Sequence, residues 1–522
     1  MDKSNPIFFY NLFFNQDTKK NRRMIIFWVL LLLVIPTPTI FGNSNLIQSA
    51  LAQTESPSTP LTEENIQTLK SDQDKRLPMQ KGFSTSVLAT NLSAPYNILY
   101  GPDNVLWITE RIGKEITRID PNNGSELSVI QVPNVHQVGK GQDGLMGMAF
   151  DPNFNNTHYI YVAYTYDDDN ASNGELDFLT KITRFTYNPE NRTISEPFDL
   201  IKGLSGSGDH NSGRMIFGPD GKLYYTIGDQ GKNYLVYYCM DNEAQDLPTE
   251  EQIQSKNWDA YEGKVLRINP DGSIPNDNPV IDDVRSHIFT YGHRNAQGIA
   301  LGPNSNYLFI AEHGDKSDDE INRLQTGGNY GWPYVSGYKD DKAYQYLNWS
   351  APDTCENLTF NNVAPPPPNV PVVNESEFQA ENFVPPIATF YTVENSYNFT
   401  DPACGEMAYI CWPTIAPSSL RLYTYDEIPD WKNTFLMPTL KAGKIFHLTL
   451  DQDGAGLAKE SEELFRSENR YRDLTFSPDG NTIYVITDTV GPAQALNGGV
   501  THDLWNPGSV LVFKYQGDGS TK

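Results

Sequence analysis

A histidine and two aspartates stand where they could perform acid–base chemistry. Asp209 and His210 lie in the glycine-rich segment 208–214 just ahead of an apolar run, and Asp229 ends the next run. If the two runs pair, Asp229 returns beside His210. A carboxylate fixes the tautomer of a neighbouring imidazole and stabilises the imidazolium that forms when the imidazole takes a proton. The pattern favours a general base at His210; a histidine bonded only within its own loop is the alternative.

A second group of residues is cationic. Lys441 lies in a short glycine-containing turn, and Arg470 and Arg472 alternate in a predicted strand, so the two arginines point to the same face. Converging guanidinium and ammonium groups suit a ligand with several carboxylates. Surface ion pairs are the alternative, although converging cations are notable in a chain with 65 acidic and 39 basic residues.

A third group offers oxygen ligands. Calcium takes six to eight oxygens from carboxylates and carbonyls on irregular loops. The segment from 312 onward provides Asp318, Asp319, Glu320, Tyr330, Tyr338, Asp340 and Asp341. Their spacing does not match an EF-hand loop, so an acidic surface loop remains the alternative to a calcium site.

A repeating strand–turn–strand unit is expected to position these groups. An apolar strand, a proline-containing turn and an aromatic-rich strand recur around Pro102, Pro152, Pro219, Pro303 and Pro478, with a weaker sixth copy at 433–450. Proline and Asp-Gly preset the turn. Because one hairpin cannot bury both its faces, the copies predict an all-β, six-bladed β-propeller. The copies are widely spaced, so long inter-strand loops are expected to form the site on one face.

Charge and the N-terminus bear on partners and location. The formal net charge of −26 argues against a nucleic-acid partner, because phosphate binding needs basic patches. A basic flank, an apolar run and a small-residue site predict an export signal or a membrane anchor in 1–52, and 53–82 reads as a disordered spacer before the propeller domain at 83–518. The chain is therefore expected to be exported to the periplasm, the cell surface or the medium.

Four cysteines are compatible with export. Cys404 and Cys411 lie close together in a loop-like stretch and could close a small disulfide ring. Cys239 and Cys355 are too far apart in sequence for their pairing to be judged. The absence of a C-x-x-C pattern argues against zinc.

Long motifs resemble one family in matching order. They include Asp-His-Asn-Ser-Gly-Arg at 209–214, Gly-His-Arg-Asn-Ala-Gln-Gly at 292–298 and Asn-Arg-Tyr-Arg-Asp at 469–473. The chain resembles the soluble quinoprotein glucose dehydrogenases of the glucose/sorbosone dehydrogenase family over about Leu88 to Tyr515. The resemblance implies a six-bladed propeller that oxidises aldose sugars at C1 to the lactone, using pyrroloquinoline quinone (PQQ) and Ca²⁺.

The resemblance also implies a role for each matched residue. His210 would be the general base, Asp229 would orient it, and Arg294 would stabilise charge that develops on the quinone. Gln142 and Asp209 would bind the sugar. The cofactor would contact Arg294, Asn295, Tyr409, Trp412, Thr414, Lys441, Arg470 and Arg472.

The same resemblance implies two kinds of calcium site. The main-chain carbonyls of Gly314 and Asp315 would hold the catalytic ion. A structural ion would use Glu320, Tyr330, Ser336, Tyr338, Asp340 and Glu375. A Cys404–Cys411 disulfide and a homodimer are family features as well, whereas the sequence does not identify the electron acceptor.

Departures from the family pattern leave the preferred sugar open. Asp315 stands where the family has proline, Tyr234 replaces a glutamine near the sugar, Ala442 replaces a basic neighbour of Lys441, and Ala296 replaces the proline after Asn295. Two other functions compete with the dehydrogenase. A calcium-dependent propeller lactonase or esterase would not need the cationic group. A non-catalytic, exported carbohydrate-binding propeller would not need His210 paired with Asp229.

Overall fold

The computed structural model describes residues 76–139, 141–167, 178–303 and 307–517. The predicted export signal or anchor at 1–52 and most of the predicted spacer therefore lie outside the described residues. Within the described ranges, no helix is long and apolar enough to span a membrane. Leu77, near the end of the predicted spacer, packs against the hydrophobic cluster around Phe465.

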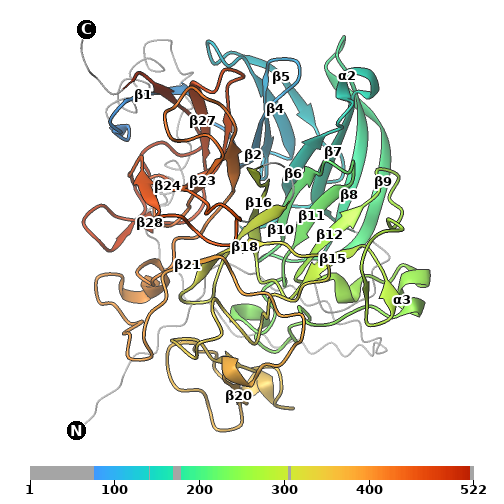
Figure 1. Ribbon diagram of the computed structural model, residues 1–522, viewed down its shortest axis with the longest axis vertical. Helices are drawn as coiled ribbons and strands as arrows, with labels where there is room; N and C mark the ends of the chain where they lie inside the picture. The colour runs from blue at the N-terminus through green and yellow to red at the C-terminus, as the bar shows by residue number, and fades with distance from the viewer. Residues whose placement is uncertain (1–75, 140, 168–177, 304–306, 518–522) are drawn as a thin grey trace, which may run out of the picture. The chain divides into compact units, whose positions relative to one another are not determined.

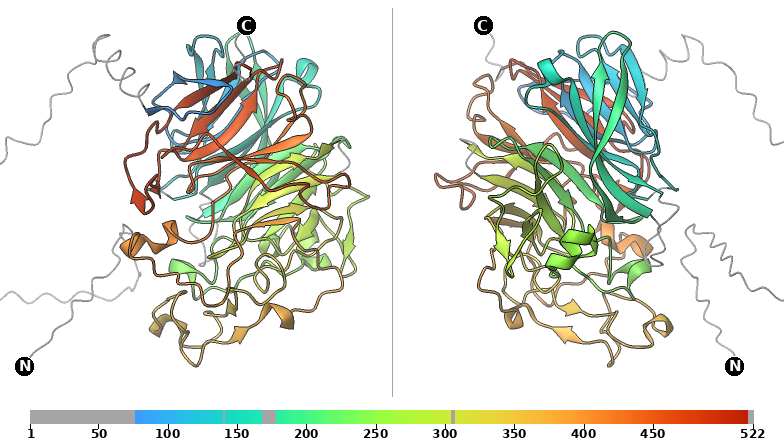
Figure 2. Two further views of the ribbon diagram at one scale, coloured as in Figure 1. Left: turned by 60° about the vertical axis from the view of Figure 1, so that its left-hand side comes forward. Right: turned by 90° about the vertical axis from the view of Figure 1, so that its right-hand side faces the viewer.

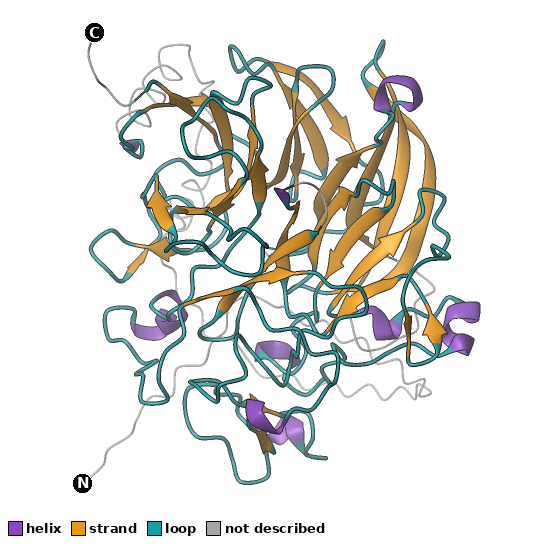
Figure 3. Cartoon of the chain, viewed as in Figure 1, coloured by secondary structure: helices purple, strands orange, loops and turns teal. Residues whose placement is uncertain are grey.

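Six four-stranded antiparallel sheets form the blades of a propeller (Figures 1 and 3). Blade 1 comprises β2 (Pro95–Tyr100), β3 (Leu106–Glu110), β4 (Glu115–Ile119) and β5 (Glu126–Gln131). Blade 2 comprises β6 (Leu145–Phe150), β7 (Tyr159–Tyr166), β8 (Phe178–Asn188) and β9 (Thr193–Gly206). Blade 3 comprises β10 (Ser212–Phe217), β11 (Leu223–Ile227), β12 (Lys264–Ile268) and β15 (Ile288–Tyr291).

The remaining blades complete the ring. Blade 4 comprises β16 (Ala296–Leu301), β17 (Leu308–Glu312), β18 (Asp319–Arg323) and β21 (Ala388–Phe390). Blade 5 comprises β22 (Arg421–Tyr423), β23 (Thr434–Pro438), β24 (Ile445–Leu448) and β25 (Glu462–Leu464). Blade 6 comprises β26 (Tyr471–Phe476), β27 (Thr482–Thr487), β30 (Val510–Tyr515) and the N-terminal strand β1 (Phe83–Ala89). Because β1 pairs with β30, the two ends of the domain close the ring.

The other elements are short and belong to connections between the blade strands. Within the described residues, the helices are α2 (Phe154–Thr157) and α3 (Glu250–Ser255), and the 3₁₀ turns are η2 (Leu235–Tyr237), η3 (Asp259–Tyr261), η5 (Cys355–Asn357), η6 (Glu375–Glu377) and η7 (Gly405–Ile410). Two-stranded ribbons are formed by β13 (Val280–Ile281) with β14 (Val284–Arg285), β19 (Tyr346–Leu347) with β20 (Val372–Val373), and β28 (Ala493–Gln494) with β29 (Val500–Thr501).

The predicted proline hairpins are confirmed for five blades. The turns at Pro102, Pro219, Pro303 and Pro478 join the two innermost strands of their blades, and Pro152 precedes α2 between β6 and β7. The weaker sixth copy at 433–450 also forms an antiparallel hairpin, of β23 and β24, but these are the second and third strands of blade 5 rather than the first two. The innermost strand β22 has only three residues and a ten-residue connection to β23, so its hairpin signal is weak.

The alternation of strand direction puts the chemically interesting residues on one face. The proline turns, which join the first strand of a blade to its second, lie on one face of the ring. The first strands therefore begin, and the second strands end, on the opposite face. The longest connection, 324–387, leaves blade 4 after β18 and carries β19 and β20. It projects from the lower side of the strands in Figures 1 and 2, and its Trp332 reaches Asp229.

The centre of the ring is held together by one buried carboxylate. Asp473 on β26 accepts hydrogen bonds from Asn97 of β2 at 2.6 Å, Arg214 of β10 at 3.0 Å and Arg421 of β22 at 2.8 Å. Ser419 donates to its other oxygen at 2.6 Å. Burial opposes ionisation of this carboxyl, but the two arginines outweigh burial and hold its pKa well below the usual range. Four innermost strands therefore converge on a single charge.

Candidate active site

His210 and Asp229 form a buried pair at the mouth of blade 3. The imidazole Nδ1 lies 2.7 Å from the Asp229 carboxylate. Asp229 is also bonded by the amide of Gly231 at 3.0 Å, the side chain of Asn242 at 3.0 Å and the indole of Trp332 at 2.8 Å. Burial opposes its charge, yet His210 and Arg294 outweigh burial and lower the pKa of Asp229. A fixed carboxylate that accepts from Nδ1–H leaves the His210 Nε2 lone pair free to take a proton.

The two residues expected to bind sugar lie beside this pair. The Gln142 amide donates to the Asp209 carboxylate, although the two residues come from different loops. The same Asp209 oxygen is 3.8 Å from His210 Nε2, which is too long for a hydrogen bond. Hydrogen-bonding groups thus flank the free nitrogen of His210 without occupying it.

Arg294 and Asn295 come from the loop that opens blade 4. The Arg294 guanidinium lies 5.2 Å from the ring centroid of Trp332 and 5.4 Å from that of Tyr234. Asp315, the residue that departs from the family pattern, approaches it to 3.9 Å. Burial disfavours the charge of Arg294, but Asp315 and Asp229 outweigh burial and raise its pKa. The departure at Asp315 therefore adds a negative charge beside the key cation.

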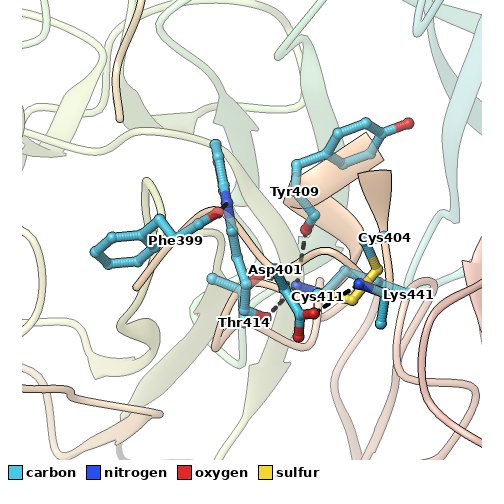
Figure 4. The surroundings of a disulfide bond; sticks show 9 residues. Phe399, Asp401, Cys404, Tyr409, Cys411, Thr414 and Lys441 are labelled. Carbon is cyan, nitrogen blue, oxygen red and sulfur yellow. Dashed lines mark hydrogen bonds between the residues drawn. A yellow bond between two sulfur atoms is a disulfide. The ribbon is translucent and has the colours of Figure 1, made fainter. Parts of the chain in front are cut away.

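Lys441 is buried between its blade and the Cys404–Cys411 loop (Figure 4). Its ammonium group donates to the carbonyl oxygens of Trp412 at 2.8 Å and Tyr409 at 3.3 Å, and to the hydroxyl of Thr414. Burial lowers the pKa of Lys441 to about 7, because Asp319 only partly compensates for the lost hydration. The lysine is therefore poised to gain charge when an anionic ligand approaches.

The two predicted arginines differ in their bonding. Arg472 pairs with Asp488 through Nε at 3.0 Å and through a terminal nitrogen. Burial lowers the pKa of Arg470 to about 10. Its Nε has no partner among the described residues, whereas another of its nitrogens donates to the carbonyl oxygen of Pro492. Arg470 Nε is therefore free to donate to a ligand, whereas Arg472 already donates to Asp488 through two nitrogens.

Sequence reasoning missed Arg111, Asp488 and Trp332. Arg111 is buried near Arg472 and Asp488 and donates to main-chain carbonyls of the loop that carries Gln142. Arg111 and Asp488 each follow the second strand of a blade directly, as Asp229 nearly does. Aligning the predicted second strands of the blades would have shown Arg111 and Asp488 at matching positions. Trp332 comes from a distant connection and had no such signal.

The residues expected to hold calcium meet only in part. Gly337 and Ser336 donate main-chain amides to Glu320 at 2.5 Å and Glu375 at 3.0 Å, which brings these buried carboxyls close together. Burial raises the pKa of both, that of Glu375 to about 8. The Tyr330 hydroxyl is bonded to the Arg323 carbonyl oxygen, so only its main chain is available to a metal.

The rest of the expected calcium set is more dispersed. Tyr338 is about 40% exposed. Gly314 and Asp315 belong to the turn that places the Asp315 carboxylate 3.9 Å from the Arg294 guanidinium. The buried Ser336 hydroxyl has no partner among the described residues. Across those residues, no three acidic, histidine or cysteine side chains form a ready-made metal cluster. A calcium ion here would therefore combine the Glu320 and Glu375 carboxylates with carbonyl and hydroxyl oxygens.

The structure is a six-bladed β-propeller that carries a buried histidine–carboxylate pair and the buried cations Arg294, Lys441 and Arg472. A model of the glucose/sorbosone dehydrogenase family matches residues 92–384 and 385–495. Quinoprotein glucose dehydrogenase B of Acinetobacter calcoaceticus is 48% identical over 440 residues, covering 84% of this chain and 92% of that protein. The chain therefore belongs to the glucose/sorbosone dehydrogenase family and is an oxidoreductase.

Solved structures show the same fold. The soluble aldose sugar dehydrogenase of Escherichia coli, in its apo form, superposes with a TM-score of 0.57 at 24% identity, covering 83% of this chain and 99% of that one. The PQQ-bound aldose sugar dehydrogenase of Streptomyces coelicolor gives 0.55 at 22% identity, covering 84% and 99%. These likenesses confirm the predicted six-bladed all-β architecture.

Proposed function

We propose that the protein oxidises aldose sugars at C1 to the lactone with PQQ as its cofactor. The observation that carries the proposal is a set of unsatisfied buried donors. Arg294 Nε, Asn295 Nδ2 and Arg470 Nε have no hydrogen-bond partner among the described residues, and all three belong to the expected cofactor set. Buried donors are nearly always bonded. A planar ligand with several carboxylate and carbonyl oxygens would satisfy them, and the quinoprotein relative supports this choice.

Each residue then has a task set by its position. When bound, the quinone supplies the acceptor for the hydride from sugar C1. His210 Nε2 takes the proton of the C1 hydroxyl, while Asp229 holds Nδ1–H and stabilises the imidazolium. Gln142 and Asp209 orient the sugar. Arg294 offers a fixed positive charge where negative charge develops, an arrangement of the oxyanion-hole type.

The cationic group of Lys441, Arg470 and Arg472 would hold the carboxylates of the cofactor. Lys441 and Arg472 are buried cationic side chains, Arg470 is partly buried, and Trp412 with Tyr409 lies on the loop that contacts Lys441. Neither the lactonase nor the carbohydrate-binding propeller needs these cationic side chains. A lactonase or a carbohydrate-binding propeller would leave three buried donors without a partner.

The proposal is tested by dye-linked oxidation of a panel of aldoses by the purified apoprotein. Activity should appear only when PQQ and Ca²⁺ are both added, and the panel would show the preferred sugar. Quinone binding without turnover would point to a substrate outside the panel. Absence of quinone binding by absorbance would overturn the proposal and favour the lactonase or the binding protein.

Quinone affinity is expected to fall as pH rises above about 7. The Lys441 ammonium is half-charged near pH 7 in the free protein, and a bound carboxylate raises its pKa. The ion pair is therefore fully available below pH 7. Above it, affinity should drop by up to about tenfold per pH unit until the pKa of the complex is reached. Absorbance titrations between pH 6 and 9 measure this slope.

A pair of lysine variants controls for other titrating groups. Lys441→Met should flatten the slope. Lys444→Met should keep it, because Lys444 pairs with Glu463 at 2.6 Å and is not part of the cationic group. An unchanged slope in Lys441→Met would contradict the assignment.

Calcium is expected to stabilise the protein through the group around Glu320 and Glu375. Two buried carboxyls with raised pKa values and an unpartnered Ser336 hydroxyl favour a cation between them. At one hundred times its dissociation constant, a bound ion adds about 2.7 kcal/mol. The melting temperature should rise with added Ca²⁺, and much less so in Glu375→Gln. Glu381→Gln, which alters an exposed carboxyl six residues along the chain, should respond like the wild type. An equal response in Glu375→Gln would refute the site.

Export remains part of the proposal. Two disulfides, Cys239–Cys355 and Cys404–Cys411, account for all four cysteines of the chain. Disulfides persist mainly outside the cytosol of mesophiles, so they support an exported enzyme. The export signal or membrane anchor remains a prediction from sequence, and the homodimer remains one that the family resemblance implies.

A further inference from the structure

Tyr234 lies against two side chains of the proposed reaction, His210 and Arg294. Its ring is nearly parallel to the His210 imidazole, with an interplanar angle of 20° and 6.2 Å between centroids. The Arg294 guanidinium lies over the same ring at 5.4 Å. The aromatic face attracts the guanidinium, and the neighbouring ring limits the rotation of the imidazole. One tyrosine therefore limits the orientations of two side chains that come from different blade loops.

Tyr234 is in turn held from behind by residues 347–362, which we call the strap. Phe360 meets the Tyr234 ring edge-on with centroids 5.3 Å apart, and the Asn362 amide donates to the Tyr234 hydroxyl at 3.4 Å. Phe360 packs against Trp349 at 5.2 Å within the strap. Lys316 donates to the Asn362 carbonyl oxygen at 2.7 Å. The tyrosine ring thus lies between the strap and the acid–base pair.

The strap is tied to the segment that carries Tyr234. Asn233 donates to the Leu347 carbonyl at 2.9 Å and accepts from the Trp349 amide at 2.7 Å. Tyr238 donates to the Leu358 carbonyl at 2.9 Å. The Cys239–Cys355 disulfide joins the same two segments across 116 residues of sequence. Since neither segment belongs to a blade strand, their mutual position depends on these contacts.

We propose that Tyr234 is a positioning residue for His210 and Arg294, and that the Cys239–Cys355 disulfide keeps it in place through the strap. The inference rests on the proposed function. Without the aromatic ring, the imidazole and the guanidinium could adopt orientations in which they do not face the sugar and the cofactor. The contacts that bind sugar and quinone would remain. The loss should therefore appear in kcat rather than in KM.

Tyr234→Leu and Tyr234→Phe make a matched pair. The leucine variant should lose at least about tenfold and up to about 10²-fold in kcat, with an unchanged KM for the aldose and unchanged quinone affinity. The phenylalanine variant keeps the ring and should retain most of the activity. Tyr307→Leu serves as the control, because Tyr307 also lies under an arginine (Arg323 at 4.7 Å) but flanks the Pro303 turn on the opposite face. An unchanged kcat in Tyr234→Leu would overturn the inference.

The disulfide is tested by combining variants. Cys239→Ser/Cys355→Ser should also lower kcat, and adding Tyr234→Leu should cause no loss beyond that of Tyr234→Leu alone, because both act on one element. Losses that multiply, or an unchanged kcat in the disulfide variant, would overturn the proposed route. If Tyr234→Leu fails to fold, the disulfide variant decides the question by itself.

A readout that does not need turnover separates this inference from the proposed function. In spectra of ¹⁵N-histidine-labelled protein, the His210 signals can be identified by their loss in His210→Gln. They should shift and broaden in Tyr234→Leu and in the disulfide variant, but not in Tyr234→Phe or Tyr307→Leu. Unperturbed His210 signals in Tyr234→Leu would overturn the inference. An inactive wild type would instead refute only the proposed reaction.

Discussion

Replacing His210 by glutamine is expected to lower kcat for aldose oxidation by about 10²–10⁴-fold, the usual contribution of a general base. Glutamine can occupy the same space but cannot take the C1 hydroxyl proton. Quinone affinity should be unchanged, because His210 is not among the buried donors that await a ligand. Steady-state kinetics with a dye acceptor, together with an absorbance titration of PQQ, measures both quantities.

A second buried histidine provides the control. His447 also pairs with a carboxylate, Glu462, at 3.1 Å, but it lies within blade 5. His447→Gln should alter stability and leave kcat unchanged. Asp229→Asn should resemble His210→Gln, since an amide that donates to Nδ1 would place the proton on Nε2. Full activity in either His210→Gln or Asp229→Asn would show that another group removes the proton.

Replacing Asp473 by leucine is expected to destabilise the fold by about 3–5 kcal/mol, the cost of leaving a buried charge without its partner. The change would strand Arg214, which is 3% exposed, and would remove the bonds to Asn97 and Ser419. Thermal and urea unfolding measure the loss. Asp426→Leu is the control, because its ion pair with Lys432 is exposed and such pairs contribute about 0–1 kcal/mol. Equal losses in the two variants would refute a central role for Asp473.

The contribution of Asp473 should also depend on pH. Its pKa is lowered in the folded state by Arg421 and Arg214 in spite of burial. A carboxyl with a lowered folded pKa stabilises the fold above its unfolded pKa of about 3.9, and this stability is lost as pH falls toward the folded value. The difference in unfolding free energy between wild type and Asp473→Leu should therefore be constant near neutral pH and shrink below about pH 4. A difference that grows on acidification would contradict the sign.

The sequence by itself determined the features that depend on short-range chemistry. Proline and Asp-Gly turns set five of the inner hairpins, because turn geometry is decided by a few adjacent residues. Pairing two adjacent strands was enough to bring Asp229 to His210, 19 residues away. The Cys404–Cys411 bridge, seven residues apart, was foreseeable for the same reason. Residue roles beyond this came from the family resemblance.

Only the tertiary structure decided which distant loops meet. The Cys239–Cys355 bridge, the reach of Trp332 to Asp229 and the convergence of Arg214 and Arg421 on Asp473 join residues that are 52 to 259 positions apart. No local propensity encodes such contacts, because they exist only after six blades have closed into a ring and brought loop ends together. The same closure buries Arg470 and Lys441 and so lowers their pKa values. The reactive residues could be predicted from the sequence, whereas the long-range contacts that hold them in position exist only in the closed ring.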